Sequence, residues 1–357
     1  MEGVEFSRYH RQMMLPTFGA NGQQRLGASS VVIVGCGALG SVVADQCVRA
    51  GVGTTTIVDR DLVDFTNLQR QTLFTEIHAQ QRRPKAEAAK ERLAEVNSAV
   101  RVRACVEEFG PSSALRITSG ADLLIDCLDN FESRLLLNDV AVQRRLPMVY
   151  GGAVAMQGMA ALLMPSLGGP CFRCLVPDLP PPGSAETCDS AGVLSSATAI
   201  TGSLEAALAL RYLAEGGDVG HPFANTLLRF DLTDFSFGRT DLQQAADPDC
   251  PCCQRSEFQF LSQDKPSARV LCGRNAVQIE PRGAVTDEAF LDRLLERLRP
   301  HGAFALAGNS LRGELVHEVS ESGTAVGLIV FPDGRMIVEG TVEPDLARSI
   351  AARFVGG

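Results

Sequence analysis

The chain has 357 residues, of which 45% are hydrophobic and 21% are charged, and its formal net charge at pH 7 is −9. This length and composition predict one large globular domain, or one large and one small. The negative charge and the lack of a basic block exclude a nucleic-acid footprint. The first residues lack the apolar core of a signal peptide, and no apolar run is long enough to span a bilayer. We therefore expect a cytoplasmic protein with no membrane partner.

The N-terminal arm, residues 7–16, carries Arg8 and Arg11 ahead of a glycine-containing loop. Its composition is typical of a solvated terminal helix. The alternative is an arginine that reaches a phosphate group in a neighbouring subunit. The local sequence leaves both interpretations open.

The stretch that follows has the pattern of a nucleotide-binding turn. Residues 31–34 form a short apolar run, as a buried parallel strand requires, and residues 39–50 continue as a helix. Between them, Gly35, Gly37 and Gly40 form G-x-G-x-x-G. Glycines there let the backbone approach a phosphate at the helix N-terminus, where free N–H groups and the helix dipole favour negative charge.

Charged side chains after the second strand narrow the choice of nucleotide. Residues 54–58 predict that strand, and Asp59 at its end would accept hydrogen bonds from ribose hydroxyls. This motif by itself favours NAD or FAD. Asn67, Arg70 and Lys85 then add an amide and two cations. Breaking the α–β bond of ATP requires such cations, because charge builds on the phosphoryl oxygens and the departing pyrophosphate.

Lys85 lies at an unusual position for a cation. Residues 60–74 read as a loop or short helical turns, and Pro84 can begin the helix that continues through residues 85–96. The helix dipole disfavours a cation at this end. A lysine placed there hints at a phosphate contact; the alternative is a solvated surface lysine.

The chain contains no G-x-x-x-x-G-K-[ST], so it is not a P-loop enzyme.

A central strand over residues 121–126 ends in two acids. Asp126 and Asp129 would lie at its carboxyl end, where open α/β sheets bind ligands. A carboxylate there can hold Mg²⁺ that bridges ATP phosphates. The alternative role is capping of the helix over residues 132–145, by Asp129 or Asn130.

The remaining elements of this region complete an α/β pattern. Further strands are expected at residues 100–105, 147–155 and 159–164, and a long helix at residues 197–215. The predicted fold class is α/β, a Rossmann-like nucleotide-binding fold with a mostly parallel sheet.

Four of the eleven cysteines form two C-x-x-C pairs, Cys171 with Cys174 and Cys250 with Cys253. In a cytoplasmic chain, such pairs supply four thiolates to a tetrahedral Zn²⁺. Neither pair follows the βαβ context of a redox C-x-x-C motif, which favours structural zinc. Cys252 could replace a neighbour as ligand, but the spacing favours the outer two cysteines.

A proline- and glycine-rich crossover loop spans residues 175–190 or so, with Cys188 at its far end. A thiol in a polar loop near a helix start is a candidate nucleophile.

From residue 268 we expect a separate α+β domain whose Asp333-Gly334 pair is a strong hairpin signal. Its predicted elements are a strand at 268–280 with a buried Cys272, a helix at 286–302, a strand at 313–320, the hairpin at 325–341 and a helix at 344–355.

Residues 7 to about 255 resemble the ThiF/MoeB/HesA family of sulfur-carrier adenylyltransferases, which are relatives of the ubiquitin-activating enzymes. The resemblance assigns residues 1–260 to an adenylation domain and leaves residues 268–357 as a small domain of unknown role. The shared motifs are R-x-x-R-Q at Arg8, Arg11 and Gln12, GCGALG at 35–40, the pair Asp59 and Asp61, NLQRQ at 67–71, RPK ending at Lys85, CLDN ending at Asn130, the four cysteines, and TCDSAGV around Cys188.

The resemblance implies ATP with Mg²⁺ and a ubiquitin-like partner that ends in Gly-Gly. The partner's carboxylate would attack the α-phosphate to give an acyl-adenylate and pyrophosphate. Asp59 would hold the ribose, with Asp61 beside it in the nucleotide site, and Asp129 would hold Mg²⁺. The phosphates would contact Asn67, Arg70 and Lys85.

The resemblance also implies a homodimer in which Arg11 reaches the partner's site. Cys188 corresponds to a loop cysteine that bonds to the carrier or relays sulfur in some relatives and is dispensable in others. Some relatives end in a rhodanese domain that supplies persulfide sulfur, whereas this tail lacks such a cysteine loop, so a persulfide donor would be a separate partner. The chain itself ends in Gly356-Gly357, like a carrier protein.

Two other classes of protein compete with this hypothesis. An NAD-dependent oxidoreductase shares the glycine turn and Asp59, but leaves Arg70, Lys85 and the four cysteines unexplained. A non-catalytic carrier-binding scaffold would be expected to have lost one of four residues, all of which are present: Arg11, Arg70, Lys85 and Asp129. The sequence leaves open whether the carrier serves molybdopterin, thiamine or tRNA thiolation.

Overall fold

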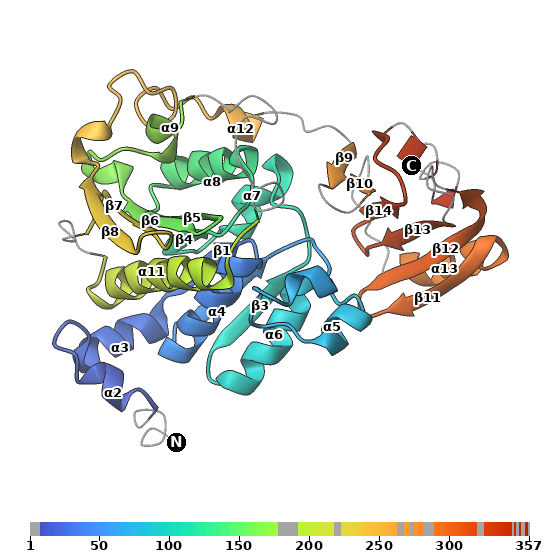
Figure 1. The fold of residues 1–357 in the computed structure, drawn as a ribbon, viewed down its shortest axis with the longest axis horizontal. Coiled ribbons are helices and arrows are strands. Elements are labelled where there is room, and N and C mark those ends of the chain that lie inside the picture. The colour runs from blue at the N-terminus through green and yellow to red at the C-terminus, as the bar shows by residue number, and fades with distance from the viewer. Residues whose placement is uncertain are drawn as a thin grey trace. The chain divides into compact units, whose positions relative to one another are not determined.

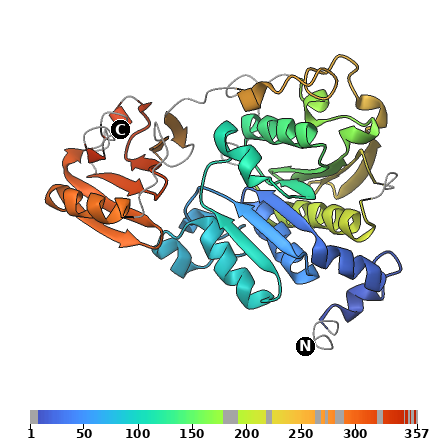
Figure 2. The ribbon, with the colours of Figure 1, turned by 180° about the vertical axis from the view of Figure 1, so that it is seen from behind.

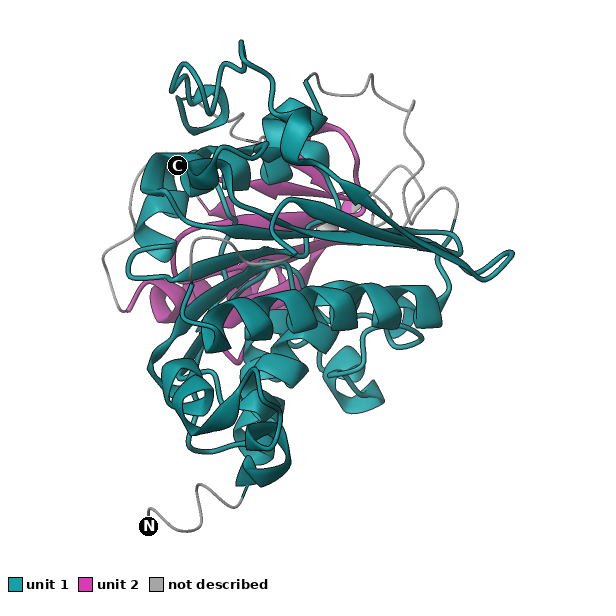
Figure 3. Ribbon diagram, turned by 90° about the vertical axis from the view of Figure 1, so that its left-hand side faces the viewer, with its two compact units in different colours: residues 1–263 teal, residues 264–357 magenta. Residues whose placement is uncertain are grey.

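The computed structural model (Figure 1, and from behind in Figure 2) divides into two compact units, residues 1–263 and residues 264–357 (Figure 3). Within the described part of the chain, no helix is both long enough and apolar enough to cross a membrane. The described residues are 8–177, 192–217, 223–262, 268–271, 275–280, 289–319, 325–344, 346–347, 350 and 354–355.

Unit 1 is built on an eight-stranded sheet. Its strands are β1 (Ser30–Val34), β2 (Thr54–Val58), β3 (Arg101–Cys105), β4 (Leu123–Asp126), β5 (Met148–Val154), β6 (Gln157–Leu163), β7 (Thr226–Asp231) and β8 (Ser236–Asp241). Their spatial order is β3-β2-β1-β4-β5-β6-β7-β8. The pairs from β3 to β5 are parallel, and those from β5 to β8 are antiparallel.

Helices cover both faces of this sheet (Figure 1). One face carries α3 (Gly19–Ala28), α4 (Ala38–Ala50), α6 (Lys85–Val96) and α11 (Ser195–Ala214). The other carries α7 (Pro111–Ile117) and α8 (Phe131–Arg144), with α9 (Phe172–Leu175) and α12 (Gln259–Ser262) against α8. Shorter elements are α2 (His10–Met13), α5 (Glu76–Gln80), η1 (Phe65–Asn67), η2 (Pro165–Leu167) and η3 (Gln243–Ala245).

The two helical layers explain the uninterrupted apolar run of β1. Val31 and Ile33 pack into the core on the side of α4 and α11, and Val32 and Val34 pack into the core on the side of α8. Because successive strand side chains point to opposite faces, a strand covered on both faces needs an apolar residue at every position. The predicted α/β class with a mostly parallel sheet is confirmed.

Unit 2 is a six-stranded antiparallel sheet in the order β11-β12-β13-β14-β10-β9. The Asp333-Gly334 hairpin is confirmed, with Val330 opposite Met336. The prediction of one strand across residues 268–280 is wrong, because β9 and β10 pair antiparallel and Asn275 between them has φ 46°. The elements are β9 (Ala268–Leu271), β10 (Ala276–Ile279), α13 (Phe290–Leu298), η4 (Arg299–His301), β11 (Gly302–Ala307), β12 (Ser310–Val319), β13 (Ala325–Val330) and β14 (Met336–Glu339).

Candidate nucleotide site and cysteine cluster

The glycine turn lies at the point where the strand order of the parallel region reverses. β1 has β2 on one side and β4 on the other, and the loops after β1 and β4 lie at the sheet edge where open α/β sheets form their ligand-binding crevice. Gly35 has φ +94°, and a Cβ there would lie 2.5 Å from the Cys127 carbonyl oxygen. A Cβ on Gly40 would lie 2.0 Å from the Gly35 oxygen. Only glycines permit this approach, which leaves the N-terminus of α4 open toward the crevice.

Asp59 joins the glycine turn to the loop after β2. Its carboxylate accepts hydrogen bonds from the backbone N–H groups of Cys36 and Asp61, both at 2.7 Å. Burial raises the pKa of Asp59, and the nearby Lys85 ammonium opposes that rise. A carboxylate has about four acceptor positions, so Asp59 retains capacity for ribose hydroxyls after making these two bonds.

Lys85 is buried beside Asp61. Its side chain is 6% exposed, and its Nζ lies 3.0 Å from the Asp61 Oδ2. The backbone fixes the pair, because the Lys85 N–H donates to the Asp61 carbonyl at 2.8 Å and Val63 donates to Arg83 at 2.8 Å. The structure therefore excludes a solvated surface lysine. The Lys85 ammonium is held beside Asp61 at the edge of the crevice.

Asn67 and Arg70 lie on the segment that follows. Asn67 is buried, and its Oδ1 accepts the Asp64 N–H at 3.0 Å, which closes η1. Arg70 is half-buried and donates to the Thr66 carbonyl at 3.0 Å. Thr72 donates to the Ser41 hydroxyl on α4 at 3.3 Å, which ties this segment to the helix that the glycine turn begins.

The structure gives different surroundings to the two acids at the end of β4. Asn130 caps α8, since its Oδ1 accepts the Ser133 N–H at 2.9 Å. Asp126 is fully buried and pairs with Arg134 at 2.9 Å, so it is not available to a metal. Among the described residues, Asp129 accepts one hydrogen bond, from the Asn130 amide at 3.1 Å. Asp129 is thus the acid of this turn that could hold Mg²⁺.

Arg11 lies on α2, and its neighbour Gln12 is bonded to the last residue of α4, at the other end of that helix from the glycine turn. Arg11 is exposed and makes no hydrogen bond or ion pair with the residues that the structure describes. Its neighbours are anchored: Gln12 donates to Gln23 at 2.7 Å and to the Ala50 carbonyl at 3.1 Å. Other predicted residues, Cys188, Cys272, Gly356 and Gly357, lie outside the described residues.

Sequence reasoning missed several polar groups around the crevice. Arg60 pairs with Glu108 at 3.0 Å, and the buried Gln71 leaves its Oε1 without a hydrogen-bond partner among the described residues. Glu205 is fully buried, with Cys127 Sγ 3.7 Å from its Oε1 and no described partner for its Oε2. Burial raises the pKa of Glu205 well above its usual range. The Gln71 signal was present within NLQRQ, whereas nothing local distinguishes Glu205.

The four predicted zinc ligands come together. The sulfur of Cys171 lies 3.8 Å from that of Cys174 and 3.7 Å from that of Cys250, and the sulfurs of Cys174 and Cys253 are 3.5 Å apart. All four sulfurs lie within 4.8 Å of one another. Tetrahedral Zn²⁺ with Zn–S bonds of about 2.3 Å places its sulfurs about 3.8 Å apart, so the residues present fit this ion.

Cys252 belongs to a different set of contacts. It donates to the Asp139 Oδ1 and accepts from the Asn138 amide on α8, each at 3.3 Å. Asn138 also accepts the Phe172 N–H at 2.7 Å. Cys252 therefore helps to fasten the cysteine segments to α8, and the four grouped sulfurs are those of the two outer pairs.

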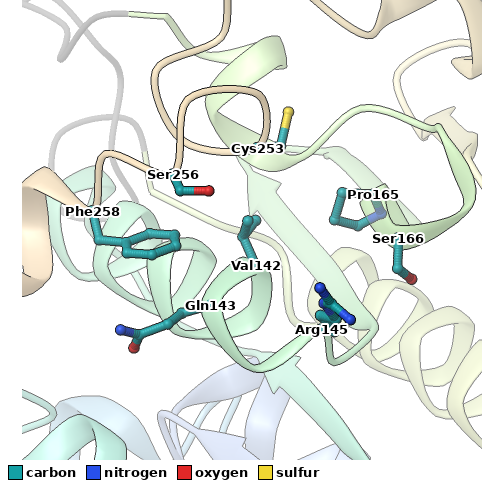
Figure 4. Close-up of a pocket in the computed structure, with 8 residues that line it drawn as sticks. All are labelled: Val142, Gln143, Arg145, Pro165, Ser166, Cys253, Ser256 and Phe258. Atoms are coloured by element: carbon teal, nitrogen blue, oxygen red, sulfur yellow. The ribbon is translucent and has the colours of Figure 1, made fainter.

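A pocket of about 540 Å³ lies beside the cysteine cluster (Figure 4). Val142 and Arg145 line it from the end of α8, and Cys253, Ser256 and Phe258 line it from the segment that follows the second C-x-x-C pair. None of the predicted nucleotide residues contributes to it.

Together, the fold and the crevice define a nucleotide-binding α/β protein with a four-cysteine cluster of metal-binding type. The model of the ThiF family matches residues 9–252, and the chain belongs to this family. It is 36% identical over 352 residues to the sulfur carrier protein ThiS adenylyltransferase of Bacillus subtilis, covering 98% of this chain and 99% of that protein. It is 42% identical over 253 residues to the sulfur carrier protein adenylyltransferase of Thermus thermophilus, covering 70% of this chain and 91% of that protein.

Solved structures share the fold at lower identity. A crystal structure of E. coli MccB with ATP has a TM-score of 0.58 and 22% identity, covering 69% of this chain and 74% of that chain. The SAMP-activating enzyme E1 of Haloferax volcanii, a relative by sequence, is 34% identical and covers 71% of this chain and 90% of that protein.

Proposed function

We propose that this protein uses ATP to adenylylate the C-terminal Gly-Gly carboxylate of a ubiquitin-like sulfur-carrier protein. The observation that carries the proposal is the buried Lys85, held by Asp61 within reach of Asp59 and the glycine turn. A nucleotide seated on that turn brings its phosphates to this cation. Both bacterial relatives described above, which are 36% and 42% identical to this chain, are named adenylyltransferases of sulfur carrier proteins.

In this proposal each group of the crevice has one task. Asp59 binds the ribose hydroxyls, and the N–H groups at the start of α4 face the phosphates. Asn67, Arg70 and Lys85 bind the phosphate oxygens, and Lys85 exchanges or shares its bond with Asp61 when the nucleotide arrives. Asp129 holds Mg²⁺, which supplies positive charge to the phosphates when bound.

The reaction breaks the bond between the α-phosphorus and the oxygen that bridges it to the β-phosphate. A carboxylate oxygen of the carrier attacks the α-phosphorus, an acyl-adenylate forms, and pyrophosphate leaves with the electron pair. A carboxylate that approaches a triphosphate faces charge repulsion, which only positioned positive charge can offset. The two cations after Asp59 meet this requirement.

The cysteine cluster belongs to the proposal as a structural zinc site. Its four sulfurs have the separations that tetrahedral Zn²⁺ requires, and two come from each of two segments distant in sequence. An ion there would join those segments and contribute folding free energy. Free thiols persist in a reducing compartment, so a cytoplasmic location is part of this proposal.

We further propose a homodimer in which Arg11 completes the site of the other subunit. Its support is that α2 is anchored through Gln12 while Arg11 projects without a partner among the described residues. Whether Cys188 bonds to the carrier, and whether a separate persulfide donor supplies sulfur, are left to experiment.

The test is ATP–pyrophosphate exchange with a carrier that ends in Gly-Gly, compared with the same carrier lacking its last glycine. Exchange should require the complete terminus. Equal rates with both carriers would overturn the proposal, and reduction of NAD by the protein would overturn it in favour of the oxidoreductase. A non-catalytic scaffold would bind the carrier with no exchange. Capture of the carrier from cell extract with Cys188→Ala and ATP would identify the pathway it serves.

A further inference from the structure

Arg134 is a buried arginine on the first turns of α8, directly after the turn that carries Asp129. Its Nη1 donates to the Asp126 Oδ2 at 2.9 Å and to the Gly151 carbonyl at 2.7 Å. Its Nη2 donates to the Leu128 carbonyl. One guanidinium therefore joins the end of β4, the turn after it and the neighbouring strand β5.

These bonds fix the peptide groups of Leu128 from both sides. The Leu128 N–H donates to the Asp126 Oδ1 at 3.1 Å, while the Leu128 carbonyl accepts from Arg134. The next residue is Asp129, whose carboxylate is oriented by the Asn130 amide. The direction in which Asp129 points thus depends on a turn whose polar backbone is tied to the Asp126–Arg134 pair.

The chemistry of this position calls for arginine. Asp126 is fully buried and the Arg134 side chain is 9% exposed, so each charge needs the other. The guanidinium lies 5.0 Å from the centre of the Tyr150 ring, which fixes its plane. A planar fork can serve three acceptors in fixed directions, whereas a lysine ammonium on a flexible stem cannot reproduce them.

We propose that Arg134 is a positioning residue for the divalent cation: it holds the 127–130 turn so that Asp129 can bind Mg²⁺ on the ATP phosphates. The proposal rests on the proposed function of Asp129. Groups that orient metal-binding carboxylates tune metal affinity without touching the metal, and their loss weakens it by about 10- to 100-fold.

Two variants test the positioning role of Arg134 without leaving an unpaired buried charge. Arg134→Lys keeps the charge that compensates Asp126 but loses the fork. The double variant Asp126→Asn with Arg134→Gln removes both charges together. The matched control is Arg144→Lys, on the same helix, where the arginine donates to the Leu115 carbonyl at 2.6 Å and is exposed. Thermal unfolding establishes that each full-length variant folds.

Two readouts are measured on each folded variant. Pyrophosphate exchange is followed against Mg²⁺ at saturating ATP and carrier, and backbone amide hydrogen exchange is followed in residues 127–130. Arg134→Lys should raise the half-saturating Mg²⁺ concentration by about tenfold, with most of the maximal rate recovered at high Mg²⁺. Amide protection in residues 127–130 should fall while that of β1 stays unchanged, and Arg144→Lys should match wild type in both readouts.

The two measurements separate this inference from the proposed function. Unchanged amide protection in both Arg134 variants would overturn the positioning role, whether or not the protein is active. Lost protection with an unchanged Mg²⁺ requirement would overturn the link to Asp129. A wild-type protein without any carrier-dependent exchange would instead remove the adenylyltransferase function on which the link depends.

Discussion

The crevice and the cysteine cluster, both in unit 1, are organised in opposite ways. In the crevice, the protein itself supplies partners: Asp59 accepts two backbone N–H groups and Asp61 pairs with Lys85. In the cluster, the protein supplies four like ligands: all four sulfurs lie within 4.8 Å of one another, and three of the pairs are 3.5–3.8 Å apart. A nucleotide site of the proposed kind is held ready by the protein's own hydrogen bonds, whereas a four-thiolate metal site would depend on its ion.

Lys85→Ala and Asp129→Ala are the two substitutions in the crevice from which we expect the largest effects. In the proposed function Lys85 stabilises the charge that develops on pyrophosphate more than it stabilises bound ATP, so carrier-dependent exchange should fall by on the order of a hundredfold or more. The loss of ATP affinity should be smaller. Lys90→Ala, an exposed lysine on the same helix, is the matched control. Equal losses of rate and ATP affinity would contradict this division.

Asp129→Ala should abolish exchange as well, with partial recovery in excess Mg²⁺, because it removes the carboxylate assigned to that ion. Cys188→Ala should leave exchange nearly intact, since a thiol can act only after the acyl-adenylate has formed. Exchange rates of the two purified variants check both expectations. A Cys188→Ala protein without exchange would place the thiol before adenylate formation.

Substitution of a cysteine of the cluster should lower the thermal stability of the protein and should not act directly on the adenylylation step. One Zn²⁺ per chain is expected, and Cys250→Ser should lower the melting temperature by on the order of 10 °C, because the ion contributes folding free energy. Cys252→Ser is the matched control, since a hydroxyl can keep the bonds to Asn138 and Asp139. Elemental analysis and thermal unfolding provide the measurements. A metal-free wild type, or zinc lost through Cys252→Ser alone, would count against the assigned ligands.

The dimer proposal predicts complementation between two inactive proteins. Mixing Arg11→Ala with Asp129→Ala subunits gives mixed dimers in which one site has both groups intact, and random assortment should restore about a quarter of wild-type exchange. If Arg11 acted within its own chain, no site in the mixture would be intact. Exchange measured after the subunits are allowed to reassort decides between the two arrangements.

The smallest effect concerns the buried Glu205, which faces Cys127, Asp126 and Arg134. Burial raises its pKa in the folded protein, so the folded state keeps a proton that the unfolded state releases above about pH 4.3. Stability should therefore fall as the pH rises from there toward neutrality. Glu205→Gln removes this loss, so the variant should be the more stable protein at pH 7 and should depend less on pH. Denaturant unfolding of both proteins at pH 5 and pH 7.5 tests whether the free energy of unfolding falls with rising pH, and whether it falls less in the variant.

Much of the fold could be predicted because its signals are local. The apolar run of β1, the glycine turn, α4 and the acid at the end of β2 follow one another in a single stretch. By contrast, β7 and β8 were absent from the prediction, and every residue of β8 is exposed. β11, with no fully buried residue, was also missed. Strands that bury little side-chain surface leave no hydrophobic period in the sequence.

The candidate site, like the fold, has residues with a local sequence signal and others whose role depends on packing. The sequence predicts Asp59, Asn67, Arg70 and Lys85 as nucleotide-binding residues because their types and order fit a triphosphate. The local sequence placed both Asp126 and Asp129 at the end of one strand, and only the family resemblance favoured Asp129 for Mg²⁺. The structure adds a physical reason, because Arg134, which also bonds to β5, pairs with Asp126.

The sequence by itself determined the strand–glycine turn–helix unit and the two C-x-x-C pairs, because the backbone freedom of glycine and the sulfur of cysteine are properties of single residues. Only the tertiary structure decided that the pairs face each other, that Lys85 is buried against Asp61, and that the turn of Asp129 is tied to Arg134. Those relations join segments distant along the chain. They exist only once the sheet has brought the strand ends together, and no local sequence pattern shows which distant segments will become neighbours.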